Sequence, residues 1–127
     1  MSIQFIEGGV TAAKGFKAAS AAAGIKKSGK LDMALVYSET PCRSAGTFTT
    51  NRVQAAPVKW DRNQVYSGDP AQAIVINSGV ANACTGDQRM GYCADTAEAA
   101  AKILGIAAGC VLGASPGVVG PPPPPGE

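Results

Sequence analysis

Residues 73–86, AIVINSGVANACTG, are the stretch that decides the predicted fold. The first four residues form an apolar run whose length and β-branched content are typical of a buried strand. Beyond it, Asn77, Ser78, Asn82 and Thr85 gather among glycine and alanine. Such side chains at a strand end often offer hydrogen bonds to a ligand, but they also satisfy the backbone of their own loop. The spacing alone favours the second interpretation.

A helix is predicted directly after this stretch, over residues 87–104. Its apolar residues recur at steps of three and four, most of them are alanine, and Gly105 would end the helix. Residues 110–114 then form a short apolar run that predicts another strand. A strand, a helix and a strand in this order indicate a crossover unit. We therefore expect an α/β fold, with mixed α+β as the alternative, in which an alanine-rich helix packs on a partial sheet.

The rest of the chain gives weaker predictions. Apolar or alternating runs predict strands at residues 3–6, 31–38 and 45–50. Residues 17–23 are rich in alanine but closely bracketed by glycines, so both helix and strand remain open. The remaining expectations are a turn at Thr40 and Pro41, a sheet edge at residues 55–58, a helical turn at 60–64 and a turn-like segment at 115–120.

Composition limits the classes of function. The chain has 127 residues, which fits one small domain or part of a larger one, and 46% of them are hydrophobic. A net charge of +2 gives no reason to expect nucleic acid or an anionic membrane surface as a partner. No apolar run is long enough for a membrane span, and the first residues lack the pattern of a signal peptide. We expect a cytoplasmic protein.

The cysteines and the absence of histidine restrict the chemistry. The four cysteines, at positions 42, 84, 93 and 110, form no C-x-x-C pair, so we expect reduced, buried thiols and no metal site. Without histidine, every Ser-His or Cys-His catalytic scheme is excluded for this chain. A nucleophile would need another means of activation.

Four blocks of sequence, in order, resemble the ornithine acetyltransferases, also called glutamate N-acetyltransferases. The blocks are GGVTAAKGFKAA at 8–19, AGTFTTN at 45–51 followed by AAPV at 55–58, residues 73–86, and VLGASPGVVG at 111–120. The resemblance implies that residues 1–120 correspond to the N-terminal part of the α-chain of that fold. Residues 121–127, with five prolines, are expected to be a disordered tail.

The resemblance implies acyl transfer in arginine biosynthesis. Members of this family cleave themselves before a threonine, which becomes the first residue of a β-chain and acts as the nucleophile. Its own α-amine serves as base, so no histidine is needed. The acetyl group passes from N-acetylornithine, or in some members from acetyl-CoA, to glutamate. The family assembles as α₂β₂ heterotetramers and needs no cofactor.

The resemblance also assigns site residues. The family's oxyanion hole uses a threonine and a glycine, which correspond here to Pro116 and Gly117. Pro116 has neither a hydroxyl nor an N–H, so the first of these donors is lost. Asn77, Ser78 and Asn82 are expected to lie near the substrate in a supporting role, although the asparagine usual in the family is replaced by Val80.

No threonine of this chain matches the family's nucleophile. We therefore expect the isolated chain to be inactive in acetyl transfer. One alternative is a non-catalytic module that binds a small amino acid through residues 77–86, or a partner through the proline run. Another is an inactive truncated product.

Overall fold

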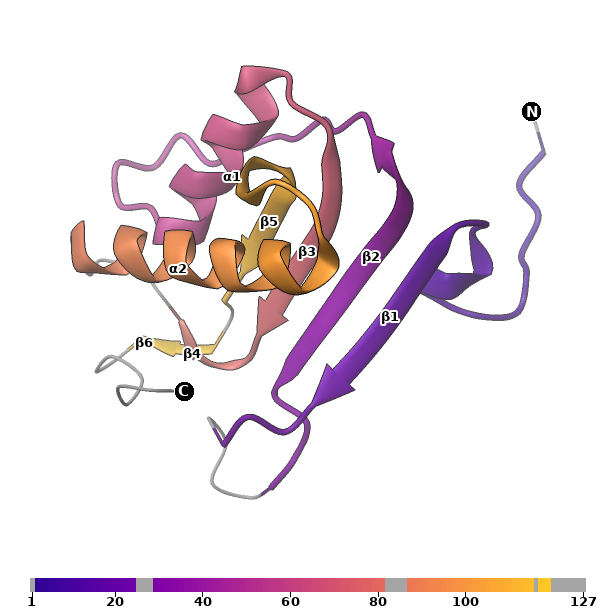
Figure 1. Ribbon diagram of the computed structural model, residues 1–127, viewed down its shortest axis with the longest axis horizontal. Coiled ribbons are helices and arrows are strands. Elements are labelled where there is room, and N and C mark those ends of the chain that lie inside the picture. The colour runs from indigo at the N-terminus through magenta and orange to yellow at the C-terminus, as the bar shows by residue number, and fades with distance from the viewer. Residues whose placement is uncertain (1, 25–28, 82–86, 116, 120–127) are drawn as a thin grey trace.

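The molecule is built on a four-stranded sheet with the order β1-β2-β3-β5 (Figure 1). The computed structural model describes residues 2–24, 29–81, 87–115 and 117–119. β1 pairs antiparallel with β2, β2 pairs antiparallel with β3, and β3 pairs parallel with β5. The strands are β1 (Phe16–Ala21), β2 (Met33–Cys42), β3 (Ala71–Asn77) and β5 (Val111–Ala114). Mixed pairing with one parallel step confirms the predicted α/β class.

Helix α2 (Asp87–Leu104) makes the crossover between the parallel strands β3 and β5. It lies across one face of the sheet, in front of β3 and β5 in Figure 1. Its predicted apolar stripe faces the sheet, and the fully buried core consists of small or β-branched side chains. These are Ala97 and Ala101 of the helix with Ala73 and Val111 of the strands. The predicted helix and its end at Gly105, which has a positive φ of 70°, are confirmed.

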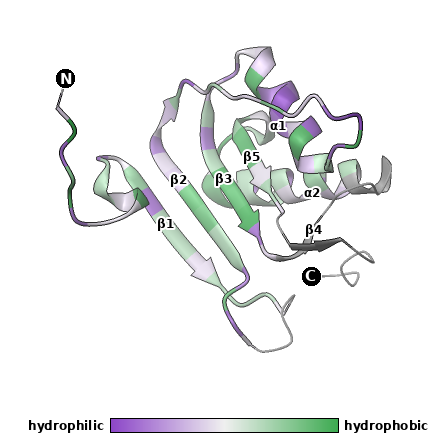
Figure 2. Cartoon of the chain, turned by 180° about the vertical axis from the view of Figure 1, so that it is seen from behind, coloured by the Kyte–Doolittle hydropathy of each residue, from purple (hydrophilic) through white to green (hydrophobic). Residues whose placement is uncertain are grey.

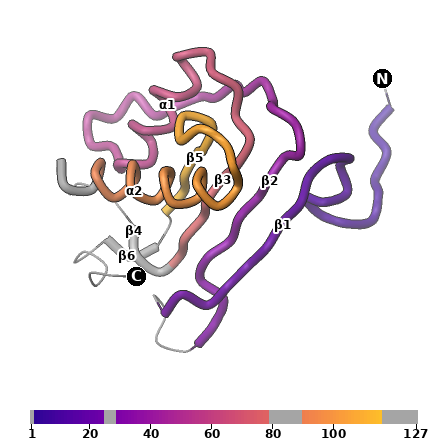
Figure 3. Tube along the Cα trace, viewed as in Figure 1, coloured from indigo at the N-terminus to yellow at the C-terminus, as the bar shows by residue number. Residues whose placement is uncertain are grey.

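Helix α1 (Ala56–Ser67) runs beside β5, at the end of the sheet away from β1 (Figure 3). The prediction of a sheet edge at residues 55–58 is wrong. Pro57 lies in the first turn of the helix, where its missing N–H would have had no partner in any case. The helical turn predicted at 60–64 is part of this helix.

Two predicted strands are absent. Residues 3–6 have no regular structure, and Phe5 in this segment is 94% exposed. An apolar run becomes a strand only when it pairs with a neighbouring strand, and none of the strand pairings among the described residues involves this run. Residues 45–50 are also irregular, because the carbonyl of Thr49 accepts hydrogen bonds from the side chains of Gln54 and Arg62 instead of from a strand.

Strand pairing also explains the secondary structure of segments whose sequence pattern was ambiguous. The alanine-rich residues 17–23, left open between helix and strand, fall mostly in β1, which aligns with β2 from Phe16 opposite Ser38 to Ala21 opposite Met33. The turn predicted at Thr40 and Pro41 is wrong, since β2 continues to Cys42. The register with β3 does shift between Tyr37 and Cys42, so this part of β2 is irregular.

The remaining elements are short. β4 (Gly79–Ala81) and β6 (Gly117–Val119) form a separate two-stranded parallel sheet, so the segment predicted as turn-like contains a strand. The 3₁₀ helices are η1 (Val10–Ala12) and η2 (Ala108–Cys110). Seen from behind, β2 and β3 consist largely of hydrophobic residues (Figure 2). Among the described residues, no helix is long and apolar enough to cross a membrane.

Candidate functional site at the carboxyl ends of β3 and β5

The predicted site residues that the structure describes lie at one end of the sheet. β3 ends at Asn77 and the parallel strand β5 ends at Ala114, and the two strands are neighbours. The chain then continues into β4 and β6, which align Gly79 with Gly117. Ligands in α/β proteins commonly bind at the carboxyl ends of parallel strands. The fold thus brings the segment with Asn77 and Ser78 close to Gly117, although about 40 residues separate them in sequence.

Asn77 and Ser78 differ in how their polar groups are used. The backbone N–H of Ser78 donates to the carbonyl oxygen of Asp32 over 2.8 Å, which fixes the end of β3 against the start of β2. The Oδ1 atom of Asn77 is buried and accepts no hydrogen bond from the described residues. Burying an acceptor costs desolvation free energy, and no hydrogen bond to a described residue compensates for that cost here. This oxygen is therefore a candidate for binding a donor from outside the chain.

Two of the predicted site residues, Asn82 and Pro116, lie outside the described residues. For Gly117 the backbone is described, as the first residue of β6. The pairing of β6 with β4 brings Gly117 close to the segment that contains Asn77 and Ser78.

A pocket of about 380 Å³ lies beside the end of β5. Its walls come from the loop before α1, the first turns of α1 and the backbone that leads out of β5. The lining residues are Phe48, Ala55, Pro57, Val58, Asp61, Gly113, Ala114 and Ser115. Ser115 immediately precedes Pro116 and Gly117, the residues of the predicted oxyanion turn, in the sequence.

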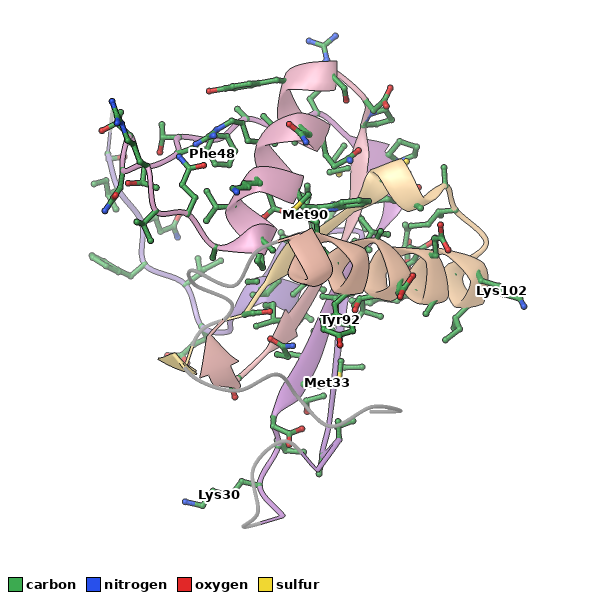
Figure 4. All side chains as sticks on the ribbon, turned by 90° about the vertical axis from the view of Figure 1, so that its left-hand side faces the viewer. Lys30, Met33, Phe48, Met90, Tyr92 and Lys102 are labelled. Carbon is green, nitrogen blue, oxygen red and sulfur yellow. The ribbon has the colours of Figure 1, made fainter. Side chains whose placement is uncertain are left out.

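The outer wall of the pocket is held by side chains of α1. The ring of Phe48 packs edge-to-face against Tyr66, with 5.7 Å between ring centroids. The Arg62 guanidinium lies 5.5 Å from the centroid of Phe48 and also donates to Gln54 and to the carbonyl of Thr49. Figure 4 shows Phe48 on the loop alongside α1. These contacts tie the irregular loop to the helix and give the pocket a fixed apolar wall.

Asp61 is the ionisable group of the pocket. Its Oδ1 accepts the backbone N–H of Gly113 over 2.8 Å. Burial raises the pKa of the Asp61 carboxyl above its ordinary value, and the hydrogen bond from Gly113 offsets part of that rise. No described lysine or arginine lies within ion-pair distance of it. On α2, burial and the charge of Asp61 raise the pKa of the Cys93 thiol to about 11.

Sequence reasoning missed Trp60, Asp61 and Asp32. The indole N–H of Trp60 donates to the carbonyl of Val111 over 2.8 Å, 51 positions along the chain. Asp32 is 3% exposed, and its Oδ1 accepts the N–H of Ala23 over 2.6 Å. No local pattern distinguishes these residues from solvent-facing polar residues, because their partners are distant in sequence.

The cysteines differ from the expectation of buried thiols. Cys42, Cys93 and Cys110 are free but only partly buried, and Cys84 lies outside the described residues. The Cys42 thiol donates to Ser38 Oγ over 3.1 Å. In the part of the chain that the structure describes, no three cysteine, aspartate or glutamate side chains gather as metal ligands would.

The strand order and the parallel pairing of β3 with β5, which α2 connects, define an α/β domain built around a β–α–β crossover. The chain belongs to the ArgJ family, whose model matches residues 17–126. A curated relative, the arginine biosynthesis bifunctional protein ArgJ of Gloeobacter violaceus, is 54% identical over 95% of this chain and 30% of its own length. The protein of the same name from Streptomyces coelicolor is 54% identical over 87% of this chain and 29% of its own length.

Solved structures agree with the family assignment. The arginine biosynthesis bifunctional protein ArgJ of Bacillus halodurans has a TM-score of 0.84 and 36% identity, covering 90% of this chain and 59% of that one. The ornithine acetyltransferase of Mycobacterium tuberculosis, solved in complex with ornithine, has a TM-score of 0.84 and 46% identity, covering 89% of this chain and 61% of that one. The chain therefore spans less than a third of the length of these curated relatives and about three fifths of the length of the solved chains.

Proposed function

We propose that this chain contributes part of the acetyl-transfer site of a glutamate N-acetyltransferase that uses N-acetylornithine as donor. The proposal is supported by the pairing of Gly79 with Gly117 and by the pocket at the end of β5. Ser115 lines this pocket and precedes Gly117, the residue expected to stabilise an oxyanion, by two positions in sequence. The name of the solved relative, an ornithine acetyltransferase bound to ornithine, supports an amino-acid substrate.

The chemistry follows from the roles expected in the family. The hydroxyl oxygen of a threonine attacks the acetyl carbonyl carbon of N-acetylornithine, and its proton passes to the threonine's own α-amine. The negative oxygen of the tetrahedral intermediate accepts the backbone N–H of Gly117. The intermediate collapses, the carbon–nitrogen bond breaks and the proton goes to the departing amine of ornithine. The glutamate amine then attacks the ester carbon of the acetyl-threonine, the bond between that carbon and the threonine oxygen breaks, and the amine proton passes through the threonine's α-amine to regenerate the hydroxyl as N-acetylglutamate leaves. Acetyl-CoA is the alternative donor.

The nucleophile has no counterpart in this sequence, so the proposal requires a second polypeptide segment. In the family this is the β-chain, within an α₂β₂ assembly. Asn77 would serve as an acceptor for an N–H of the substrate, because its buried Oδ1 has no partner among the described residues. Ser78 would act through its backbone, by holding the end of β3 to Asp32.

The proposal is tested by joining this chain to the downstream part of the Streptomyces coelicolor relative. We expect the joined protein to convert N-acetylornithine and glutamate to ornithine and N-acetylglutamate, measured by mass spectrometry. The 127-residue chain alone is expected to release no ornithine.

The matched control replaces the nucleophilic threonine of the downstream part by alanine, which should abolish turnover. Robust ornithine release by the chain alone would contradict the proposal. So would a joined protein that folds and cleaves itself but transfers no acetyl group.

A further inference from the structure

β5 is an edge strand of the four-stranded sheet, and side chains of α1 form hydrogen bonds with the backbone of its outer edge. In a parallel strand the N–H and C=O of one residue point to the same side, and alternate residues share a side. On β5, the carbonyl of Val111 and the N–H of Gly113 both bond to α1 side chains, so both residues present their backbone to the outer edge. An edge of this kind normally needs another strand or a covering element.

Two consecutive residues of α1 supply the missing partners. Trp60 donates its indole N–H to the carbonyl of Val111, and Asp61 accepts the N–H of Gly113, each over 2.8 Å. One residue gives a donor and the next gives an acceptor, which is the pair of groups that a neighbouring strand would offer. We call this pair of side chains the edge clamp.

The edge clamp binds β5 at Val111 and Gly113, a few residues before the predicted oxyanion turn in sequence. Gly113 precedes Gly117 by four residues, and β5 ends at Ala114. Of the two bonds, the one made by Asp61 lies closer to the turn. We propose that Trp60 and Asp61 are positioning residues that fix the carboxyl end of β5 and thereby hold the Gly117 N–H in place. The catalytic part of this inference rests on the proposed acetyl transfer.

The surroundings of Asp61 favour a fixed role. The carboxylate is partly buried against β5 and has no described cationic partner, so its stabilisation comes from the Gly113 N–H. The pKa of the carboxyl is raised by burial, which is the cost of keeping a charge at this place.

Amide hydrogen exchange of the 127-residue chain, read residue by residue by NMR, tests the proposal without substrate. Asp61→Leu removes the acceptor. We expect exchange to become about tenfold faster or more at Gly113 and at residues 117–119, with the amides that join β1 to β2 unchanged. Asp61→Asn keeps an acceptor oxygen and should restore most of the protection at both places.

Trp60→Phe is the second variant, since it keeps an aromatic ring while removing the indole N–H together with the five-membered ring that carries it. It should also speed exchange at residues 117–119 while sparing the β1–β2 amides. The proposal is overturned if residues 117–119 exchange at the wild-type rate in both variants, or if all amides lose protection together. Because the readout involves no substrate, it is independent of whether the joined protein transfers acetyl groups.

Discussion

By its resemblance to the ornithine acetyltransferases, Pro116 is expected to stand at the position of a threonine that stabilises the oxyanion in that family. Proline carries no N–H and no hydroxyl, so one of the two oxyanion donors expected in the family is lost. Losing a single oxyanion donor lowers turnover by roughly 10²–10³ in other enzymes. Gly117 would then be the remaining donor of the turn.

Restoring the threonine should raise the rate. In the protein joined to the downstream part of the Streptomyces coelicolor relative, Pro116→Thr is expected to increase kcat by about 10² with little change in KM, because the donor acts on the transition state. The measurement is steady-state ornithine release. Val119→Thr adds a hydroxyl three residues further on and should leave the rate unchanged. Equal kcat for Pro116→Thr and the parent protein would show that the hydroxyl is not needed.

Cys93 should be unreactive at neutral pH, because its thiol pKa is raised to about 11 and only the thiolate is nucleophilic. Burial is the main cause, and the charge of Asp61 adds to it by repelling the thiolate. Removing that charge with Asp61→Asn lowers the thiol pKa, so alkylation of Cys93 at about pH 9 should become faster. Peptide mass mapping after iodoacetamide treatment measures the rate.

Labelling of Cys110 in the same sample is the internal control for unfolding. Faster labelling of Cys93 alone supports the electrostatic cause. An unchanged rate at Cys93, or faster labelling at both cysteines, would contradict it.

At the scale of elements, the alanines of α2 set how closely the helix approaches the sheet. Ala97 and Ala101 are 2% and 4% exposed and pack with Ala73 and Val111. Interiors are close-packed, so a larger side chain at these positions must displace the helix or adopt a strained rotamer.

Ala97→Leu should therefore destabilise the fold by about 1–3 kcal/mol, seen as a lower midpoint of urea unfolding. Ala99→Leu is the matched control, since this position lies on the exposed side of the same helix. Both variants change helix propensity equally, so the difference between them reports packing. Similar midpoints for the two variants would show that α2 does not pack closely at Ala97.

The elements were predictable to the extent that their patterns are local. The period of α2 and its end at Gly105 can be read from residues 87–105, and β3 and β5 can be read from their apolar runs. Residues 3–6 and 45–50 carry equally good strand patterns, yet they have no strand partner. β1 shows the converse case, because an alanine-rich segment became a strand by pairing with β2.

For the whole molecule, the candidate site depends on contacts between distant segments. The sequence pointed to Asn77, Ser78 and Gly117, and the parallel pairing of β4 with β6 brings their segments together. It did not point to Trp60 or Asp61, whose partners on β5 lie about 50 residues away. Neither residue stands in a pattern that distinguishes it from the rest of α1.

The family and the crossover unit around residues 73–86 could be predicted from the sequence alone, and so could the expectation that an oxyanion donor is missing at Pro116. These features reside in residue types, short periods and the order of blocks, all of which are local. By contrast, the covering of the β5 edge by α1 and the position of Asp61 in the pocket at the end of β5 became visible only in three dimensions. The physical reason is that an edge strand leaves backbone groups unpaired, and the partner that satisfies them is selected by packing in three dimensions.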